Sequence, residues 1–261
     1  MLNPLIRGYL CGCMSQFPHD NIKPFEGAGE KKQQVSEMFD EIAPRYDFMN
    51  RFLSVGIDVG WRIKAIRQFK NENPQHILDV ATGTADMAIR ACKMLPVQKV
   101  TGIDISENML NYGRQKIAKE GLTGRIELQS GDSEQIKFAD NTFDGVMVAF
   151  GVRNFQNLEK GLGEIYRVMK PGAKLVILEF SQPRIPGVRS LYNFYMSLVA
   201  PQMAALFRQN KKAYQYLNES AKAFPDRERF LSVLKTVGYT NTSFKPLSLG
   251  ICCIYIGKKP V

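Results

Sequence analysis

The chain has 261 residues, of which 44% are hydrophobic and 23% charged, as in an ordinary soluble globular protein. This length suits one large α/β domain with a well-buried core. The formal net charge of +10 favours an anionic partner such as nucleic acid, an acidic lipid surface or an anionic substrate. A generally basic surface accounts for the charge equally well.

The first 30 residues, rich in Gly, Pro and Lys toward their end, are predicted to form a flexible tail. Their apolar run is too short for a signal peptide. Either Met1 or Met14 could be the residue at which translation starts. None of the five cysteines has the spacing of a zinc site, so we predict no metal and unpaired thiols in a reduced, cytoplasmic compartment.

Residues 31–70 are predicted to form an N-terminal helical cap. It begins with a short helix over 31–39, followed by the aromatic-rich stretch 46–62, "YDFMNRFLSVGIDVGWR". This stretch either packs as a structural cap on the core or acts as a lid over a pocket.

From residue 76 onward, apolar runs typical of strands alternate with segments of helical periodicity, which predicts a doubly wound, mostly parallel sheet. Ser106 is the expected N-cap of the second of these helices, and Pro171-Gly172 are expected to end the third. The expected strands cover 76–81, 99–106, 125–132, 142–152 and 174–180, and the helices cover 86–95, 107–122 and 157–172.

The C-terminal part differs in character. The uncharged segment 190–207 is interpreted as a helix over an apolar ligand pocket, with a core helix or a membrane span as alternatives, in a helical lid over 184–224. A second helical stretch covers 213–224, and an amphipathic helix covers 226–239. Two β-runs in 240–259 predict an antiparallel hairpin at one sheet edge.

The loop after the first predicted strand, "ILDVATGTAD" over 77–86, is the first place to expect a ligand, because open α/β sheets bind ligands beyond the carboxyl ends of their strands. Gly83 allows close approach of the backbone. Asp79 and Asp86 bracket the loop, and their carboxylates would repel a pyrophosphate but attract a cation. The loop therefore favours S-adenosylmethionine, which carries a sulfonium and an ammonium group, over a dinucleotide.

Two further loops fit the same cofactor. Asp104 ends the second strand, where a carboxylate can accept both ribose hydroxyls. Asp132 can accept the adenine amino group, and the backbone of Ser133 can complete the purine edge. Each acid also has a plain structural interpretation, as a helix N-terminal charge or as part of a polar turn.

These motifs resemble class I S-adenosylmethionine-dependent methyltransferases, and more narrowly the UbiE/MenG family of quinone C-methyltransferases, over about residues 33–259. The specific motifs are "YDFMNRFLSVGIDVGWR" (46–62) and "FGVRN" (150–154), supported by "LDVATGTAD" (78–86), "GIDISENML" (102–110), "YRVMKPG" (166–172), "LEFSQP" (178–183), "YLNESAKAFP" (216–225) and "GICCIYIGKK" (250–259). Ala85 and Ala149 depart from the family, which commonly has glycine at the first position and, in some members, a cofactor-contacting serine at the second.

The resemblance implies a Rossmann-like class I methyltransferase domain over 31–261 that methylates a ring carbon of a prenylated quinol, such as demethylmenaquinol. It implies cofactor contacts at Thr84, Asp104, Asp132 and Ser133, with the loop around Asp79 and Gly83. A benzoquinol of ubiquinone biosynthesis, and an RNA or protein substrate, remain alternatives. We expect no nucleic-acid partner; contact with the inner face of a membrane and a homodimer are left open. Basic residues that could rest on anionic lipid are Arg184, Arg189, Arg208, Lys211 and Lys212.

For catalysis, Arg153 is predicted to stabilise a developing phenolate, unless it pairs with a structural carboxylate. Asn154 is predicted to orient the same oxygen. Tyr46 and Asp47 are candidates for a base or a hydrogen-bond relay. The two histidines are poorly placed, since His19 lies in the tail and His76 begins the first strand.

Overall fold

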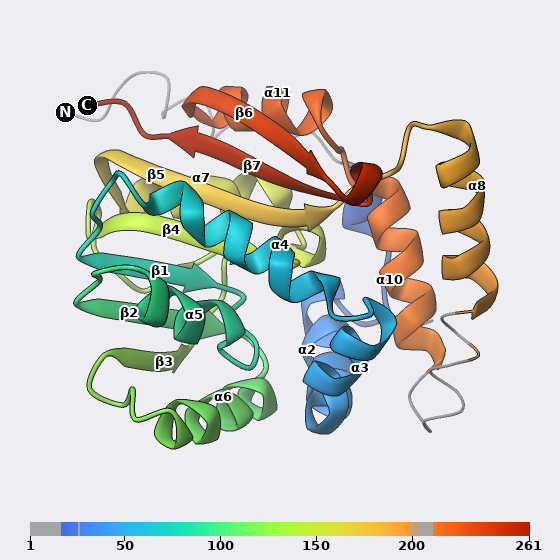
Figure 1. Cartoon of the computed structure of the whole chain (residues 1–261), viewed down its shortest axis with the longest axis horizontal. Helices are drawn as coiled ribbons and strands as arrows, with labels where there is room; N and C mark the ends of the chain where they lie inside the picture. The colour runs from blue at the N-terminus through green and yellow to red at the C-terminus, as the bar shows by residue number, and fades with distance from the viewer. Residues whose placement is uncertain (1–16, 26, 200–201, 203–210) are drawn as a thin grey trace.

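A computed structural model describes residues 17–25, 27–199, 202 and 211–261 of the chain. Seven strands form one sheet in the order β3-β2-β1-β4-β5-β7-β6 (Figure 1). The first five in sequence pair in parallel, and β7 runs antiparallel to both β5 and β6. The strands are β1 (His76–Val80), β2 (Lys99–Asp104), β3 (Ile126–Ser130), β4 (Phe143–Ala149), β5 (Met169–Phe180), β6 (Thr240–Leu247) and β7 (Cys252–Lys258).

The predicted doubly wound sheet and its antiparallel C-terminal hairpin are thus confirmed. The helices are α2 (Lys31–Ile42), α3 (Tyr46–Leu53), α4 (Ile57–Ile66), α5 (Asp86–Met94), α6 (Glu107–Lys119), α7 (Leu158–Val168), α8 (Pro186–Phe194), α10 (Lys211–Ala223) and α11 (Glu228–Val237). Short helical turns are η2 (Pro18–Asn21), η3 (Ala43–Arg45), η4 (Arg67–Phe69), η5 (Val152–Asn154), η6 (Tyr195–Val199) and η7 (Ser248–Gly250).

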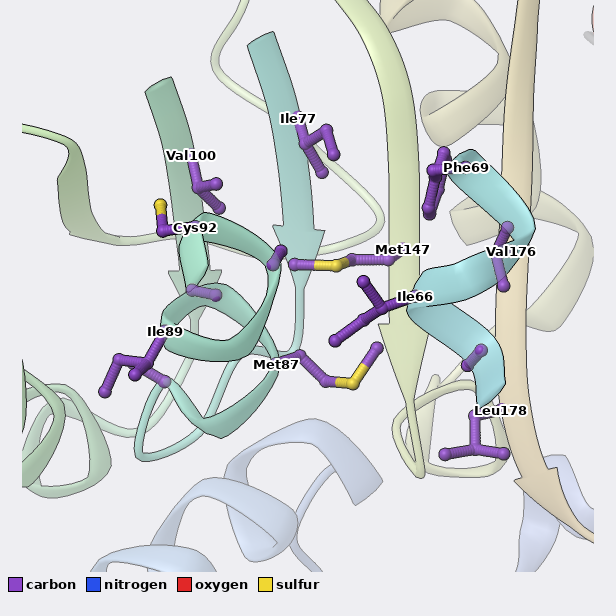
Figure 2. Packing of buried hydrophobic residues seen from close by; sticks show 14 of the residues in the cluster. Ile66, Phe69, Ile77, Met87, Ile89, Cys92, Val100, Met147, Val176 and Leu178 are labelled. Atoms are coloured by element: carbon purple, nitrogen blue, oxygen red, sulfur yellow. The ribbon is translucent and has the colours of Figure 1, made fainter. Parts of the chain in front are cut away.

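The two faces of the sheet carry separate hydrophobic cores, because successive strand residues point to opposite faces. On one face, Ile77, Val100, Met147 and Val176 pack against α4 and α5 (Figure 2). On the other, the alternate strand residues pack against α7 and α11; they include Leu78, Val80, Val146, Val148, Leu175 and Ile177. Burial on both faces explains why the central strands are nearly continuous apolar runs.

The predicted N-terminal cap divides into two parts. Helix α4 lies along the sheet and contributes Trp61, Ala65 and Ile66 to the core, so this part is structural. Helices α2 and α3 instead gather with α8 and α10 at the end of the sheet where β1 and the strands parallel to it terminate (Figure 1). This is the end at which a ligand is expected.

The prediction of a flexible tail over residues 1–30 is wrong for the segment around η2. His19 is fully buried, its ring meets Phe224 edge to face, and its carbonyl oxygen accepts a hydrogen bond of 2.7 Å from Lys31 Nζ. Lys31 Nζ also donates to the carbonyl oxygens of Arg153 and Phe155. The buried ammonium therefore ties the segment to the turn after β4. Residues 1–16, with Met14, Cys11 and Cys13, lie outside the described part of the chain.

Helix α7 ends at Val168, before the predicted stop at Pro171-Gly172. The residue before a proline disfavours helical backbone, and strand partners are available for the following residues. Met169 pairs with Phe143 of β4, and the amide of Gly172 donates to the carbonyl oxygen of Lys259. The sequence 169–172 therefore opens strand β5.

The uncharged segment 190–207 is described up to residue 199, and again at residue 202. Its first part belongs to α8, which continues into the single π-helical turn η6. Across the described residues, no helix is both long enough and apolar enough to cross a membrane. The remaining predicted lid residues, 200–201 and 203–210, and with them Arg208, lie outside the described ranges.

Candidate active site

Three adjoining cavities open at this end of the sheet, and Tyr46 lines all three. We name them the central cavity, which includes Gly83, Asp104, Asp132 and Asn154; the loop cavity, which includes Asp79 and Thr84; and the aromatic cavity, which includes Phe39, Trp61, Phe150, Arg153 and Phe180. The central and aromatic cavities are partly open to solvent, and both polar and apolar side chains line them.

All ten residues predicted for the site line one of these cavities. Most of them lie at the carboxyl ends of β1, β2, β3 and β4 or in the loops that follow these strands. Helix α3 adds Tyr46 and Asp47. The three acids that the sequence assigned to a cofactor therefore converge in space from three separate loops.

The loop after β1 adopts a strained backbone. Ala81, Gly83 and Ala85 all have positive φ, of 54°, 57° and 64°. A Cβ built on Gly83 meets no other atom within 4 Å, so this glycine faces open space beside two cavities. Its amide donates a hydrogen bond of 2.8 Å to Asp104 Oδ2, which joins the loops after β1 and β2.

Asp104 is buried at the carboxyl end of β2. Its Oδ1 accepts from the amide of Ser106, and Oδ2 accepts from Gly83. Burial nevertheless raises the pKa of Asp104 to about 6. Each carboxylate oxygen retains a lone pair for a further donor, as two ribose hydroxyls would require.

Asp79 is almost fully buried beneath the loop cavity. Its Oδ2 accepts a hydrogen bond of 2.7 Å from the Thr82 hydroxyl, while its Oδ1 has no hydrogen-bond partner within the described ranges. Burial raises the pKa of Asp79 to about 7. An acceptor left unpaired beside a cavity fits a bound ammonium group, so these residues suit the amino-acid end of S-adenosylmethionine.

Asp132 already has a cationic partner. Lys32 of α2 donates from Nζ to Asp132 Oδ2 at 2.6 Å, and the amide of Glu134 donates to Oδ1. Lys32, Asp132 and Ser133 line the same part of the central cavity. An adenine amino group at Asp132 would therefore share this carboxylate with Lys32 or displace the lysine. The contact with Lys32 was not predicted from the sequence.

Thr84 and Asp47 contact each other directly. The Thr84 hydroxyl donates to Asp47 Oδ1 at 2.6 Å, and Lys116 of α6 donates to Asp47 Oδ2 at 2.7 Å. Lys116 also pairs with Asp86 at the start of α5. Asp47 thus holds α3 against the loop, and this network was not foreseen from the sequence.

Arg153 pairs with a structural carboxylate, as one of the two interpretations of the sequence held. Its Nη1 donates to Glu179 Oε1 at 2.8 Å and to the carbonyl oxygen of Phe150. Its guanidinium also lies 5.4 Å from the centroid of the Phe180 ring, on the wall of the aromatic cavity. Asn154 is fixed beside it, because its Oδ1 accepts from the Tyr216 hydroxyl at 3.1 Å.

The model of the ubiE/COQ5 methyltransferase family matches residues 27–259 of the chain. The chain belongs to this family. Among its relatives is a protein of Bacteroides fragilis named demethylmenaquinone methyltransferase, 46% identical, in an alignment that spans 93% of this chain and 99% of the relative. A second, from Geotalea daltonii, is named ubiquinone/menaquinone biosynthesis C-methyltransferase UbiE and is 46% identical over 88% of this chain and 98% of the relative.

Solved structures share the fold at low sequence identity. A [4+2]-cyclase, SpnF, superposes with a TM-score of 0.58 at 16% identity, covering 88% of this chain and 97% of the cyclase. A Haemonchus contortus phosphoethanolamine N-methyltransferase 2 in complex with S-adenosyl-L-methionine gives a TM-score of 0.56 at 17% identity, covering 77% of this chain and 52% of that one. The predicted family and fold are thereby confirmed, and this member of the ubiE/COQ5 family is a methyltransferase with the class I fold.

Proposed function

We propose that this methyltransferase transfers the methyl group of S-adenosylmethionine to a ring carbon of a prenylated quinol, with demethylmenaquinol as the acceptor. The observation that carries the proposal is the aromatic cavity, which adjoins the cofactor residues through Phe39, Tyr46 and Phe150. A flat, electron-rich ring fits between such side chains. The two relatives' printed names, which include menaquinone, support the choice of acceptor.

The cofactor supplies an electrophilic methyl group on a sulfonium. Asp79 binds its ammonium, Asp104 its ribose and Asp132 with Ser133 its adenine, while Gly83 and Thr84 shape the loop beside it. The protein then has to align the acceptor carbon with the methyl group and favour the ionised quinol.

Arg153 places positive charge at the wall of the aromatic cavity, and Asn154 holds the adjoining turn. Burial raises the pKa of Tyr46 above its ordinary value, so its hydroxyl stays protonated at neutral pH. Tyr46 therefore acts as a hydrogen-bond donor to a ring oxygen rather than as a base. Asp47 serves to hold α3 in place, and the released proton passes to water.

The test is an assay with labelled S-adenosylmethionine and reduced acceptors. We expect label in menaquinol when demethylmenaquinol is supplied, and slower or no labelling of the corresponding demethylated benzoquinol. Preferred labelling of the benzoquinol would assign the ubiquinone alternative. Label in RNA or protein, with none in either quinol, would overturn the proposed function.

We also propose that the protein rests on an anionic membrane surface where its acceptor is dissolved. Two groups of exposed apolar side chains lie beside each other: Phe48, Phe52, Val55 and Ile57 near the α3–α4 turn, and Leu191, Phe194 and Leu198 on α8 and η6. The Tyr195 hydroxyl bonds the carbonyl oxygen of Leu53 at 2.8 Å, which joins the two groups. Exposed apolar patches of this kind mark interaction surfaces. Of the predicted basic contacts, Arg184 and Arg189 are both exposed, and Arg184 pairs with Glu228.

A further inference from the structure

Arg62 lies where the aromatic and loop cavities meet, and it lines both. It lies on the same side of α4 as Ala65 and Ile66, which belong to the sheet core, so the core holds the backbone at Arg62 in place. Only 6% of the residue is exposed. Arg153, by contrast, lines the aromatic cavity but not the loop cavity. Arg62 therefore borders both the aromatic cavity, assigned to the acceptor, and the loop cavity, assigned to the amino-acid end of the cofactor.

The orientation of the Arg62 guanidinium is set by two contacts. Nη1 donates to Asp58 Oδ2 at 2.6 Å, one helical turn earlier, and Asp58 Oδ1 in turn accepts from the Ser54 hydroxyl at 2.8 Å. The guanidinium also lies 5.1 Å from the centroid of the Phe150 ring. Asp58 is thus held on both oxygens and holds the arginine in one position.

Most of the donor capacity of Arg62 is not used by this pair. A guanidinium carries five N–H groups, and the buried Nε of Arg62 has no partner among the described residues. An unpaired buried donor is costly unless a ligand satisfies it. The same guanidinium also acts on Tyr46, because its charge lowers the Tyr46 pKa against the larger effect of burial.

We propose that Arg62 is a further catalytic residue, which donates hydrogen bonds to the ring oxygen next to the acceptor carbon, with Asp58 as its positioning residue. The inference rests on the proposed function. The quinol hydroxyl first gives its proton to water. The ring carbon then forms a bond to the methyl carbon while the carbon–sulfur bond breaks and its electron pair stays on sulfur. Loss of the proton from that ring carbon to water restores the aromatic ring as a phenolate, which takes one proton back from water to give the methylated quinol.

In this order of reaction steps, negative charge on the ring oxygen is greatest before methyl transfer. A fixed guanidinium beside that oxygen, on a residue that is only 6% exposed, stabilises the ionised acceptor without having to reorient. The buried Nε of Arg153 also has no partner among the described residues, but its Nη1 donates to both Glu179 and the Phe150 carbonyl oxygen, and Arg153 does not line the loop cavity. The two arginines then have different roles. Arg153 stabilises the wall of the aromatic cavity, and Arg62 contacts the ring oxygen of the acceptor.

The test uses the full chain with the variants Arg62→Met, Arg62→Lys and Asp58→Asn, and with Lys64→Met as the matched control on the exposed side of α4. We expect Arg62→Met to lower kcat about 100-fold or more, the size of effect seen when one charge-stabilising donor is removed, while S-adenosylhomocysteine binds within threefold of wild type. Arg62→Lys keeps the charge opposite Asp58 but loses the planar fork, and should lower kcat about tenfold or more. Asp58→Asn should lower kcat less than Arg62→Met, and Lys64→Met should not change it.

Added guanidinium ion provides a readout that a purely structural role would not move. It should restore part of the turnover of a further variant, Arg62→Ala, and leave Lys64→Met unaffected. If Arg62→Met destabilises the fold, Arg62→Lys is measured in its place. An active wild type with kcat unchanged in Arg62→Met and in Arg62→Lys would overturn the inference alone. A wild type inactive on every quinol would overturn the proposed function and this inference with it.

Discussion

At the scale of single residues, the loop after β1 shows three alternating residues with positive φ, at Ala81, Gly83 and Ala85. For a residue with a Cβ this conformation costs roughly 1–2 kcal/mol, and at Ala85 it replaces the glycine common in the family. Strain of this kind persists only where surrounding contacts enforce it, and here Ala85 is fully buried. The loop is therefore held in shape before any ligand binds.

Gly83 gives a prediction that separates backbone strain from cofactor binding. The change Gly83→Ala should cost about 1 kcal/mol in stability and lower the affinity for S-adenosylhomocysteine more than tenfold, because the new methyl group enters the space beside the central and loop cavities. Gly121→Ala is the matched control, with φ of 68° and equally open surroundings at the end of α6. Calorimetric titration and urea unfolding measure the two effects, and equal affinity losses in the two variants would contradict the prediction.

The raised pKa values of Asp79 and Asp104 predict how cofactor binding depends on pH. With pKa values of about 7 and about 6, both carboxyls are largely neutral at pH 5, and they ionise as the pH rises to 7.5. Because a bound ammonium favours the ionised form of Asp79, affinity should rise about tenfold or more across this range.

Calorimetric titration with S-adenosylhomocysteine at several pH values checks this dependence. In Asp79→Asn, the affinity for S-adenosylhomocysteine should change much less with pH than in wild type. Asp144→Asn should leave the pH dependence intact, since Asp144 accepts hydrogen bonds from the backbone of Gln75 and His76 at the other end of the sheet. An affinity that falls as the pH rises would refute the assignment of Asp79 to the ammonium.

At the scale of elements, α2 and α3 form one wall of the cavities. Helix α2 supplies the buried Lys31, which bonds three carbonyl oxygens, and Lys32 over Asp132. It also receives the hydrogen bond from the Ser106 hydroxyl to Asp40 Oδ1 at 2.6 Å. Helix α3 is held through Asp47. These polar contacts, made across long sequence separations, fix the cap over the cavities.

Breaking the α3 contact should loosen the cap without unfolding the sheet. Lys116→Met removes the ammonium that joins Asp47 to Asp86, so we expect faster dissociation of the cofactor and a rise of about fivefold or more in its KM. Lys93→Met is the matched control, because Lys93 also joins α5 to α6, through an exposed pair with Glu120 that does not involve the cap. Stopped-flow release of S-adenosylhomocysteine measures the difference; equal release rates would count against a cap held by Lys116.

At the scale of the whole molecule, the net charge of +10 and the apolar side chains around α3 and α8 combine to favour an anionic surface. The double variant Phe52→Asp and Leu191→Asp should bind phosphatidylglycerol vesicles at least tenfold more weakly, while turnover of a short-chain quinol in solution stays near that of wild type. Met94→Asp, an exposed apolar position at the far end of α5, should bind vesicles as wild type does. Vesicle sedimentation measures binding, and equal binding by all three proteins would exclude this face.

Much of the fold could be predicted because its signals are local. The alternation of strands and helices, the Ser106 N-cap, whose Oγ accepts from the amide of Met109, and the C-terminal hairpin all follow from short-range patterns. The end of α7 was misplaced because the pairing of Met169 with Phe143, far away in sequence, decided it. The segment around η2 was misjudged for the same reason, since its burial depends on Lys31 and Phe224.

The sequence by itself determined the sheet, the family and the loops that carry the candidate cofactor residues, because strand ends and motif spacing are encoded in neighbouring residues. Only the tertiary structure decided the partners of the charged side chains: Glu179 for Arg153, Lys32 for Asp132, and Thr84 with Lys116 for Asp47. It alone placed Arg62 between two cavities. The role of a charge depends on which groups lie within a few ångströms and how much water is excluded, and both are properties of the packed chain.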